Sequence, residues 1–206
     1  MSPKLKLIVL LSGGGTTFVN IQDHINSGDL NARIDLVISS RADAKGLERA
    51  QVRGIETAVV ESKEYKRQTA IANGWKYSPD WHAMSKAIND IILPRKPDLV
   101  CLAGFMCHYF FPTELNGKVI NIHPALLPSF GGQGMYGHRV HEAVIKSGVK
   151  FSGCTVHFCD QNYDTGHIIV QRVCPVRPED TPDSLAARVF KEECVAYPDA
   201  IRTFYA

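Results

Sequence analysis

The sequence predicts an α/β fold of the Rossmann-like type: a mostly parallel twisted sheet with helices on both faces and an antiparallel C-terminal portion. Short apolar runs alternate with helical patterns through the first 123 residues, which is typical of parallel strands joined by helices. A glycine-rich loop follows the first run, and after Pro128 the alternation gives way to a second glycine-rich loop and two further runs. The 206 residues, 45% of them apolar, suffice for one core, so we expect a single domain, 1–206.

The expected elements follow from these patterns in chain order. Apolar runs predict strands at residues 5–11, 34–39, 56–60, 99–103 and 119–122. Helical spacing of apolar residues predicts the intervening helices at residues 17–26, 44–53 and 82–94. The remaining expectations are a loop at 131–137, a helix at 138–147, strands at 154–159 and 168–173, and a closing helix at 184–204. Ligands of such sheets bind at the carboxyl ends of the strands, where the first glycine loop and the end of the fifth strand both fall.

Charge and hydropathy exclude two classes of partner. The chain has 23 basic and 21 acidic residues and no basic run, so we expect no nucleic-acid partner. The apolar run at residues 5–11 ends in a glycine loop rather than a cleavage site, and no stretch approaches the roughly 20 apolar residues of a membrane span. We therefore expect a cytoplasmic protein acting on small molecules, without a membrane partner, and either a monomer or a homodimer.

The cysteines favour a reducing compartment and no metal. All six are scattered without a Cys-x-x-Cys pair, which favours reduced, buried thiols. A zinc site made by Cys154 or Cys159 with His138 and His141 is the alternative, since histidines three apart can share a helix face. Their spacing matches no closed zinc motif, so no metal is expected.

The first glycine loop has the form of an anion site. Three glycines ending at Gly15 follow a strand, and Thr16 and Thr17 open a helix whose first N–H groups can hold an anion. A dinucleotide fingerprint would have glycine in place of Phe18, and the lysine of a nucleoside triphosphate loop is missing. A phosphate monoester fits best; a tight turn without a ligand is the alternative.

A polar pair ends the fifth expected strand. Alternation places Asn121 and His123 on one side of that strand, and Pro124 ends it. An amide that donates to a developing oxyanion, beside an imidazole that moves a proton, suits acyl transfer. Asp164 is the candidate carboxylate that would hold the imidazole and raise its pKa. In the alternative interpretation the three residues are purely structural. Asn121 is then a turn residue at the end of the strand, His123 a core histidine whose hydrogen bonds are made within the protein, and Asp164 a residue that caps a loop.

Several motifs carry a family resemblance along nearly the whole chain. They are SGGGTT at 12–17, DAKGLERA at 43–50, LAGFM at 102–106, NIHPALLP at 121–128 and GCTVHF at 153–158. Together with Asp164 and with Glu193 ahead of Tyr197-Pro198, they resemble the folate-dependent formyltransferases. Only residues 62–85 show no resemblance to this family.

The resemblance implies a reaction and its residues. It implies the Rossmann-like formyltransferase fold and transfer of the formyl group of 10-formyltetrahydrofolate, a co-substrate, to the amine of glycinamide ribonucleotide in de novo purine biosynthesis. It makes residues 1–103 a phosphate-binding half and residues 104–206 a catalytic and folate-binding half. The implied catalytic residues are Asn121, His123 and Asp164. The implied ribonucleotide residues are Gly15, Thr16 and Thr17 for the phosphate and Glu193 for the glycinamide end.

The resemblance also implies a folate pocket. Its residues are Met106, Cys107, His108, Tyr109, Asn121, Asp160, Gln161, Asn162, Tyr163 and Asp164. Two departures stand out: Cys107 occupies a position where the family commonly has arginine, and no arginine for the folate tail lies near residues 80–82.

The expected mechanism needs no covalent enzyme intermediate. The amine attacks the formyl carbon, Asn121 and a protonated His123 stabilise the oxyanion, and His123, its pKa raised by Asp164, carries the proton. The loop at residues 129–137 is expected to be either a lid or a rigid glycine turn.

Three other functions stay open at this point. Formyltetrahydrofolate hydrolases share the Asn-x-His and Asp pattern but usually carry an amino-terminal regulatory domain that we do not expect here. Sugar or other amine N-formyltransferases would use the same three residues with a different acceptor. A folate- or phosphate-binding module without catalysis would not need Asn121, His123 and Asp164 together.

Overall fold

The structure is a computed structural model, and it describes residues 3–71 and 74–205. Five residues of the predicted 1–206 domain lie outside the described part: Met1, Ser2, Ala72, Asn73 and Ala206.

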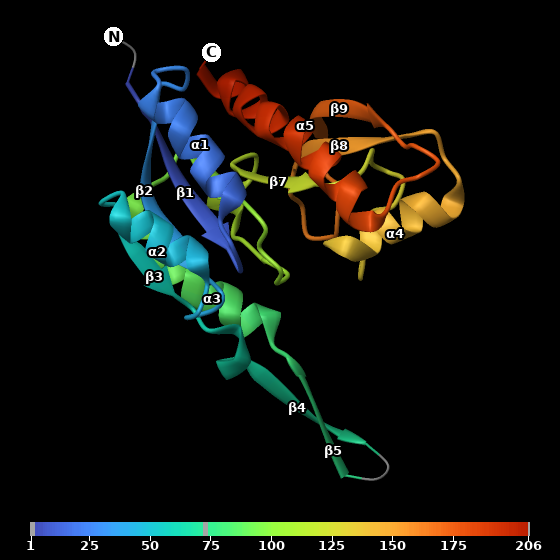
Figure 1. Ribbon diagram of the computed structural model, residues 1–206. Coiled ribbons are helices and arrows are strands. Elements are labelled where there is room, and N and C mark those ends of the chain that lie inside the picture. The colour runs from blue at the N-terminus through green and yellow to red at the C-terminus, as the bar shows by residue number, and fades with distance from the viewer. Residues whose placement is uncertain (1–2, 72–73, 206) are drawn as a thin grey trace.

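A seven-stranded sheet in the order β3-β2-β1-β6-β7-β8-β9 forms the centre of the molecule (Figure 1). Its strands are β1 (Leu5–Leu11), β2 (Ala32–Ser39), β3 (Thr57–Val59), β6 (Leu99–Leu102), β7 (Val119–His123), β8 (Phe151–Phe158) and β9 (Ile168–Pro175). Neighbours from β3 to β7 run parallel, whereas β8 and β9 pair antiparallel. The predicted fold class, a mostly parallel sheet with an antiparallel C-terminal portion, is confirmed.

Helices cover both faces of this sheet. The bounds are α1 (Thr16–Asn26), α2 (Lys45–Val52), α3 (Trp81–Ile92), α4 (His138–Ser147) and α5 (Pro182–Arg202). One apolar core joins β1 to α1, α2, α4 and α5, and a second joins the other face to α3. Short 3-10 turns are η1 (Ser62–Glu64), η2 (Leu93–Arg95), η3 (Thr113–Leu115) and η4 (Thr203–Tyr205).

The two expected helices at the C-terminal end form, with shifted bounds at α5. The α4 helix has the predicted range, and Gly148 ends it in the left-handed region at φ 72°. The α5 helix starts two residues earlier than predicted because the Thr181 hydroxyl accepts from the Ser184 N–H and Pro182 fits the first turn.

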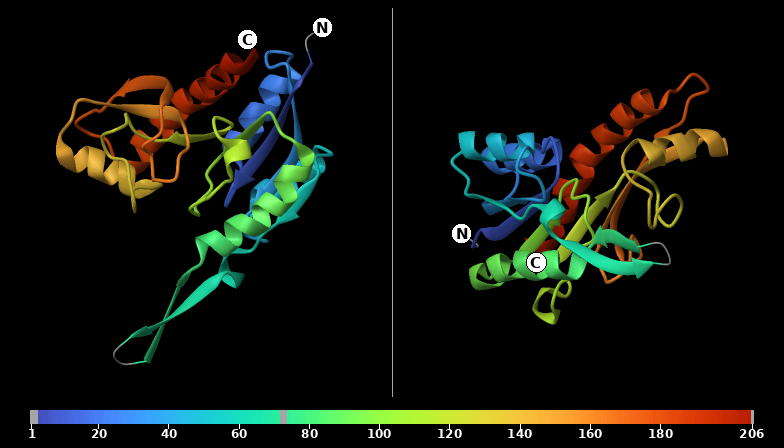
Figure 2. Two further views of the ribbon diagram at one scale, coloured as in Figure 1. Left: turned by 180° about the vertical axis from the view of Figure 1, so that it is seen from behind. Right: turned by 90° about the horizontal axis from the view of Figure 1, so that it is seen from below.

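A two-stranded hairpin projects away from the sheet (Figure 1 and the left view of Figure 2). Its strands, β4 (Lys66–Ile71) and β5 (Gly74–Pro79), pair with one another and with no strand of the large sheet. It lies within the stretch at 62–85 that resembles no family motif. The sequence analysis did not predict it, because its polar strands lack the apolar alternation that signals a half-buried strand.

The strand order creates the space for a site. Strand β1 has β2 on one side and β6 on the other, so the chain leaves their carboxyl ends in different directions. The glycine loop follows β1, the residues from 103 to 109 follow β6, and β7 ends beside them at His123.

Candidate active site

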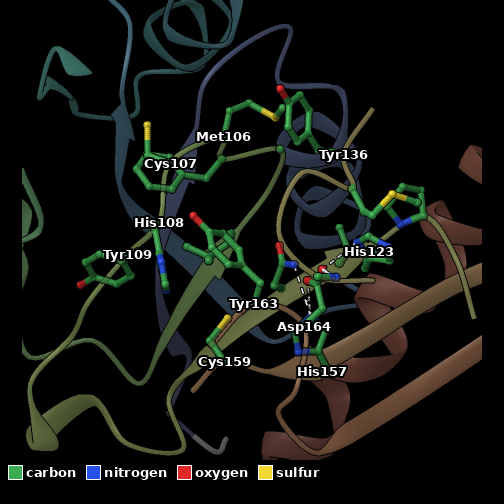
Figure 3. A pocket seen from close by; sticks show the side chains of 18 of the residues that line it. Met106, Cys107, His108, Tyr109, His123, Tyr136, His157, Cys159, Tyr163 and Asp164 are labelled. Carbon is green, nitrogen blue, oxygen red and sulfur yellow. Dashed lines mark hydrogen bonds and ion pairs between the residues drawn. The ribbon is translucent and has the colours of Figure 1, made fainter. Parts of the chain in front are cut away.

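A cavity of about 300 Å³ opens at this carboxyl edge of the sheet (Figure 3). Segments far apart in the chain contribute to its wall: residues 104–109, 121–124, 132–137 and 157–164, with Thr17 from α1 and Glu193 from α5. The predicted site residues in its lining are Thr17, Met106, Cys107, His108, Tyr109, Asn121, His123, Asp160, Asn162, Tyr163, Asp164 and Glu193. Gly15, Thr16 and Gln161 are not in the lining, and the Gln161 amide instead donates to the Phe111 carbonyl at 3.3 Å.

The catalytic candidates come together as a cluster. Asn121 and His123 lie two residues apart on β7, and His123 Nδ1 is 3.5 Å from Asp164 Oδ2. The same carboxylate oxygen accepts a hydrogen bond of 2.9 Å from the Gly132 N–H. Asp164 takes a left-handed φ of 57°, which aspartate tolerates better than most residues.

His157 on β8 completes this cluster, and the sequence analysis assigned it no role. It is opposite Asn121 in the β7–β8 pairing, and its Nε2 is 3.3 Å from Asn121 Nδ2 and 3.6 Å from Asp164 Oδ1. Its Nδ1 is 2.8 Å from the Phe158 carbonyl, so Nδ1 carries the proton and Nε2 accepts from the Asn121 amide. One N–H of the Asn121 amide is thereby bonded to His157. Because the amide is planar, this bond also fixes the direction of its second N–H. The signal that could have found His157 is the antiparallel pairing of its strand with β7.

The protonation of His123 differs from the expectation. Burial lowers the pKa of His123, and the opposing effects of Asp164 and the Phe130 carbonyl do not overcome it. The expectation that Asp164 would keep this pKa raised was therefore wrong, because the imidazole is 4% exposed and loses its hydration. His123 Nε2 donates to the Phe130 carbonyl at 2.8 Å, so both ring nitrogens already face protein groups.

Asp164 is the charged member of the cluster. Burial alone would raise the pKa of this carboxyl, but its contacts with His157 and His123 and the hydrogen bond from the Gly132 N–H outweigh it and lower the pKa. Asp164 is thus held as a carboxylate between two imidazoles (Figure 3). An ionised carboxylate there stabilises either imidazole when it takes up a proton.

Glu193 presents a carboxylate to the same cavity from α5. Burial raises the pKa of this carboxyl to about 7. Within the described part of the chain, its side chain makes no hydrogen bond or ion pair. A carboxylate in this position gains from a cationic or hydrogen-bond-donating ligand, because nothing in the protein replaces its lost water.

The loop before α1 is built from backbone. Gly15 takes a φ of 70°, and a Cβ there would approach the Gly46 Cα to 2.7 Å. Gly46 N–H also donates to the Gly13 carbonyl at 3.0 Å, so the DAKG motif supports the glycine loop, a role that the sequence analysis missed. Within the described residues no side chain caps the start of α1, so its first N–H groups can bind an anion.

The folate candidates line the other end of the cavity. A row of ring contacts runs from His82 on α3 through Phe110 and His108 to Tyr163, with centroids 3.8, 4.2 and 4.1 Å apart in turn. The first two pairs are stacked and the third is tilted, and His108 and Tyr163 line the cavity. Burial lowers the pKa of His108, which favours its neutral form. Met106 points toward Tyr136 at the rim (Figure 3), and both are about half exposed. Flat apolar walls of this kind suit a flat heterocycle.

The described residues contain neither a cluster of metal ligands nor a membrane-spanning helix. Among residues 3–71 and 74–205, no group of three or more His, Cys, Asp or Glu side chains is placed to hold a metal ion. Within the same residues, no helix has the length and apolarity to cross a membrane.

Comparisons with known proteins agree with this geometry. A family profile described as formyl transferase matches residues 5–201. The chain is 36% identical over 200 residues to a chloroplastic phosphoribosylglycinamide formyltransferase of Arabidopsis thaliana, covering 95% of this chain and 64% of that protein. It is 37% identical over 201 residues to the trifunctional purine biosynthetic protein adenosine-3 of Bos taurus, covering 97% of this chain and 18% of that protein.

A solved structure is similar in fold as well. The crystal structure of glycinamide ribonucleotide transformylase 1 from Symbiobacterium toebii superimposes with a TM-score of 0.84 at 36% identity, covering 99% of this chain and 89% of that one. The chain therefore spans less than two thirds of the plant and bovine relatives but most of the bacterial structure.

Proposed function

We propose that this chain, which belongs to the formyl transferase family, transfers the formyl group of 10-formyltetrahydrofolate to the amine of glycinamide ribonucleotide in de novo purine biosynthesis. The names of its relatives support this acceptor, and the donor follows from the folate resemblance of its motifs. Purine biosynthesis from these two small molecules is consistent with a cytoplasmic protein.

One observation carries the proposal. A single cavity contains the catalytic cluster, Thr17 beside the glycine loop, the unpaired carboxylate of Glu193, and the segment that begins at Met106. A phosphate at the glycine loop and an amine at Glu193 are the two ends of glycinamide ribonucleotide. The folate would lie against the residues after Met106, so the formyl carbon and the amine would meet near Asn121.

In the proposed reaction, the glycinamide amine attacks the formyl carbon and negative charge develops on the formyl oxygen. The Asn121 N–H that is not bonded to His157 donates to this oxygen, a type of contact worth about 3–4 kcal/mol in other enzymes. The orientation costs nothing during the reaction, because His157 holds the amide beforehand.

Proton transfer falls to His123. The amine loses a proton as the carbon–nitrogen bond forms, and the folate nitrogen gains one as it leaves. His123 is neutral before the reaction and can accept a proton, after which Asp164 at 3.5 Å stabilises the imidazolium. His123 Nε2 carries the proton that it donates to the Phe130 carbonyl, so before Nε2 can accept the amine proton this carbonyl must give way and the imidazole proton must move to Nδ1, beside Asp164. This step would give the loop at residues 129–137 a part in each turnover.

We also propose the division of labour implied by the family resemblance. Residues 1–103 hold the phosphate, and residues 104–206 supply catalysis and most of the folate pocket, all within one domain. Glu193 is the exception to this division, because it belongs to residues 104–206 but binds the amine end of the ribonucleotide.

The acceptor requirement tests this function. Protein mixed with 10-formyltetrahydrofolate should release little tetrahydrofolate until glycinamide ribonucleotide is added, and then formyl transfer should begin. The product is followed by the absorbance change of the folate and by mass spectrometry of the ribonucleotide.

Each rival function gives a different result in the same assay. Rapid deformylation without an acceptor would mean that water takes the formyl group, as in a hydrolase. Turnover only with an amino-sugar nucleotide would mean a sugar N-formyltransferase, and binding of both ligands without transfer would mean a binding module.

A further inference from the structure

Ser12 lies at the junction between the glycine loop and the folate-lining segment. It follows the last residue of β1 and precedes Gly13, and its side chain is buried, with 5% of the residue exposed. The segment after β6, which includes Met106 and Cys107 of the cavity wall, lies next to it in contact with its side chain.

Both the backbone and the side chain of Ser12 bind that segment. Its N–H donates to the Gly104 carbonyl at 3.0 Å, and its Oγ accepts from the Met106 N–H at 2.8 Å. In the described residues, no other hydrogen bond joins residues 12–17 to residues 104–109. The two substrate subsites are thus tied together at one residue.

A second serine extends this link. The buried Ser40, at the end of β2, hydrogen-bonds to Ser12 through the two hydroxyl groups at 2.6 Å. Ser12 Oγ therefore accepts from both the Ser40 hydroxyl and the Met106 N–H, and these two bonds fix the position of the oxygen.

We propose that Ser12 is a positioning residue that couples the two substrates, so that ribonucleotide bound at the glycine loop increases the affinity for folate, and the reverse. The inference rests on the proposed function, since it needs both ligands to bind at these two ends of the cavity. Binding a phosphate orders the backbone that begins at Gly13, and the Ser12 hydrogen bonds carry that order to Met106. The second ligand then binds a segment that is already ordered.

The coupling is measurable as a ratio of dissociation constants. Calorimetric titration gives the Kd of 5,8-dideazafolate, which carries no formyl group to transfer, with and without saturating glycinamide ribonucleotide. In the unmodified protein we expect the ribonucleotide to tighten folate binding by about tenfold, within the usual range of such couplings. By reciprocity, the folate analogue should tighten ribonucleotide binding by the same factor.

Three serine variants locate the effect. Ser12→Ala should bring the ratio close to one, and Ser40→Ala should reduce it in part. Ser39→Ala is the matched control, because Ser39 is also buried but its hydroxyl, among the described residues, bonds only to the backbone of Arg41, so the ratio should stay at the unmodified value. If Ser12→Ala does not fold, the reduced ratio in Ser40→Ala against Ser39→Ala carries the test.

The outcomes separate this inference from the function itself. A ratio near one in the unmodified protein, with both ligands bound and formyl transfer intact, would overturn the coupling and leave the function standing. An unchanged ratio in both Ser12→Ala and Ser40→Ala would also overturn it. Failure of either ligand to bind the unmodified protein would count against both.

Discussion

The glycine loop after β1 and the catalytic cluster after β7 lie at the same edge of the sheet but are built in different ways. The loop offers backbone N–H groups, and its shape depends on the close approach of Gly15 to Gly46. The cluster is made of side chains from β7, β8 and the loop at Asp164, each held by another. A backbone site tolerates changes of side chain, whereas an interlocked cluster does not.

The largest expected effect comes from breaking the cluster. His123→Ala, Asn121→Ala or Asp164→Asn should each lower the rate of formyl transfer at least a hundredfold, because each group acts on charge that develops in the transition state. Single-turnover rates measure this, with circular dichroism as the check on folding. Near-normal chemistry in His123→Ala would rule out His123 as the proton carrier.

His157 tests whether the cluster is truly interlocked. His157→Ala should slow formyl transfer by about 10- to 100-fold, because the Asn121 amide loses the partner that orients it. The double variant with Asn121→Ala should be little slower than Asn121→Ala alone, since residues that act together are not additive. Multiplicative rate losses would instead mean that the two act independently.

Glu193 should affect the acceptor and leave the folate donor unchanged. Glu193→Gln should raise the KM for glycinamide ribonucleotide about tenfold at pH 8, because a charged partner of the amine is replaced by a neutral one. The folate KM should not change, which is the internal control. An equal rise in the KM for both substrates would mean that Glu193 does not belong to the acceptor subsite.

The same variant has a pH-dependent effect on stability. The pKa of Glu193 is raised to about 7 in the folded protein, so folding favours the protonated form and the stability contribution is lost as the pH rises from about 4.5 through 7. Glu193→Gln should therefore be more stable than the unmodified protein by about 2–3 kcal/mol at pH 8, and by much less at pH 5. Urea unfolding at the two pH values measures the difference, and an equal difference at both would contradict the raised pKa.

The smallest effect is expected at the backbone-built loop. Thr17→Val keeps the side-chain shape and the backbone N–H groups, so the KM for the ribonucleotide should rise less than tenfold while kcat stays within about twofold. Gly15→Val would not make this comparison, since its side chain would meet the Gly46 backbone and distort the loop itself. A hundredfold loss in Thr17→Val would mean that the loop depends on side chains as the cluster does.

Local patterns were enough to predict the parallel strands, the glycine loop and the pairing of Asn121 with His123. Strand alternation and apolar runs are properties of neighbouring residues, so they appear in the sequence without knowledge of the fold. The motifs of the family resemblance supported the choice of Asp164 and added Glu193 and the folate segment, which no local pattern connects.

Tertiary structure alone decided the partners and the protonation of these groups. The contacts of His157 with Asn121, of His123 with the Phe130 carbonyl and of Ser12 with Met106 join segments that only folding brings together. The lowered pKa of His123 and the raised pKa of Glu193 follow from burial, which depends on every element packed around the group. The sequence by itself thus determined which chemical groups the site contains, and the packing of distant segments determined their charge and orientation, because desolvation and hydrogen bonding act through space rather than along the chain.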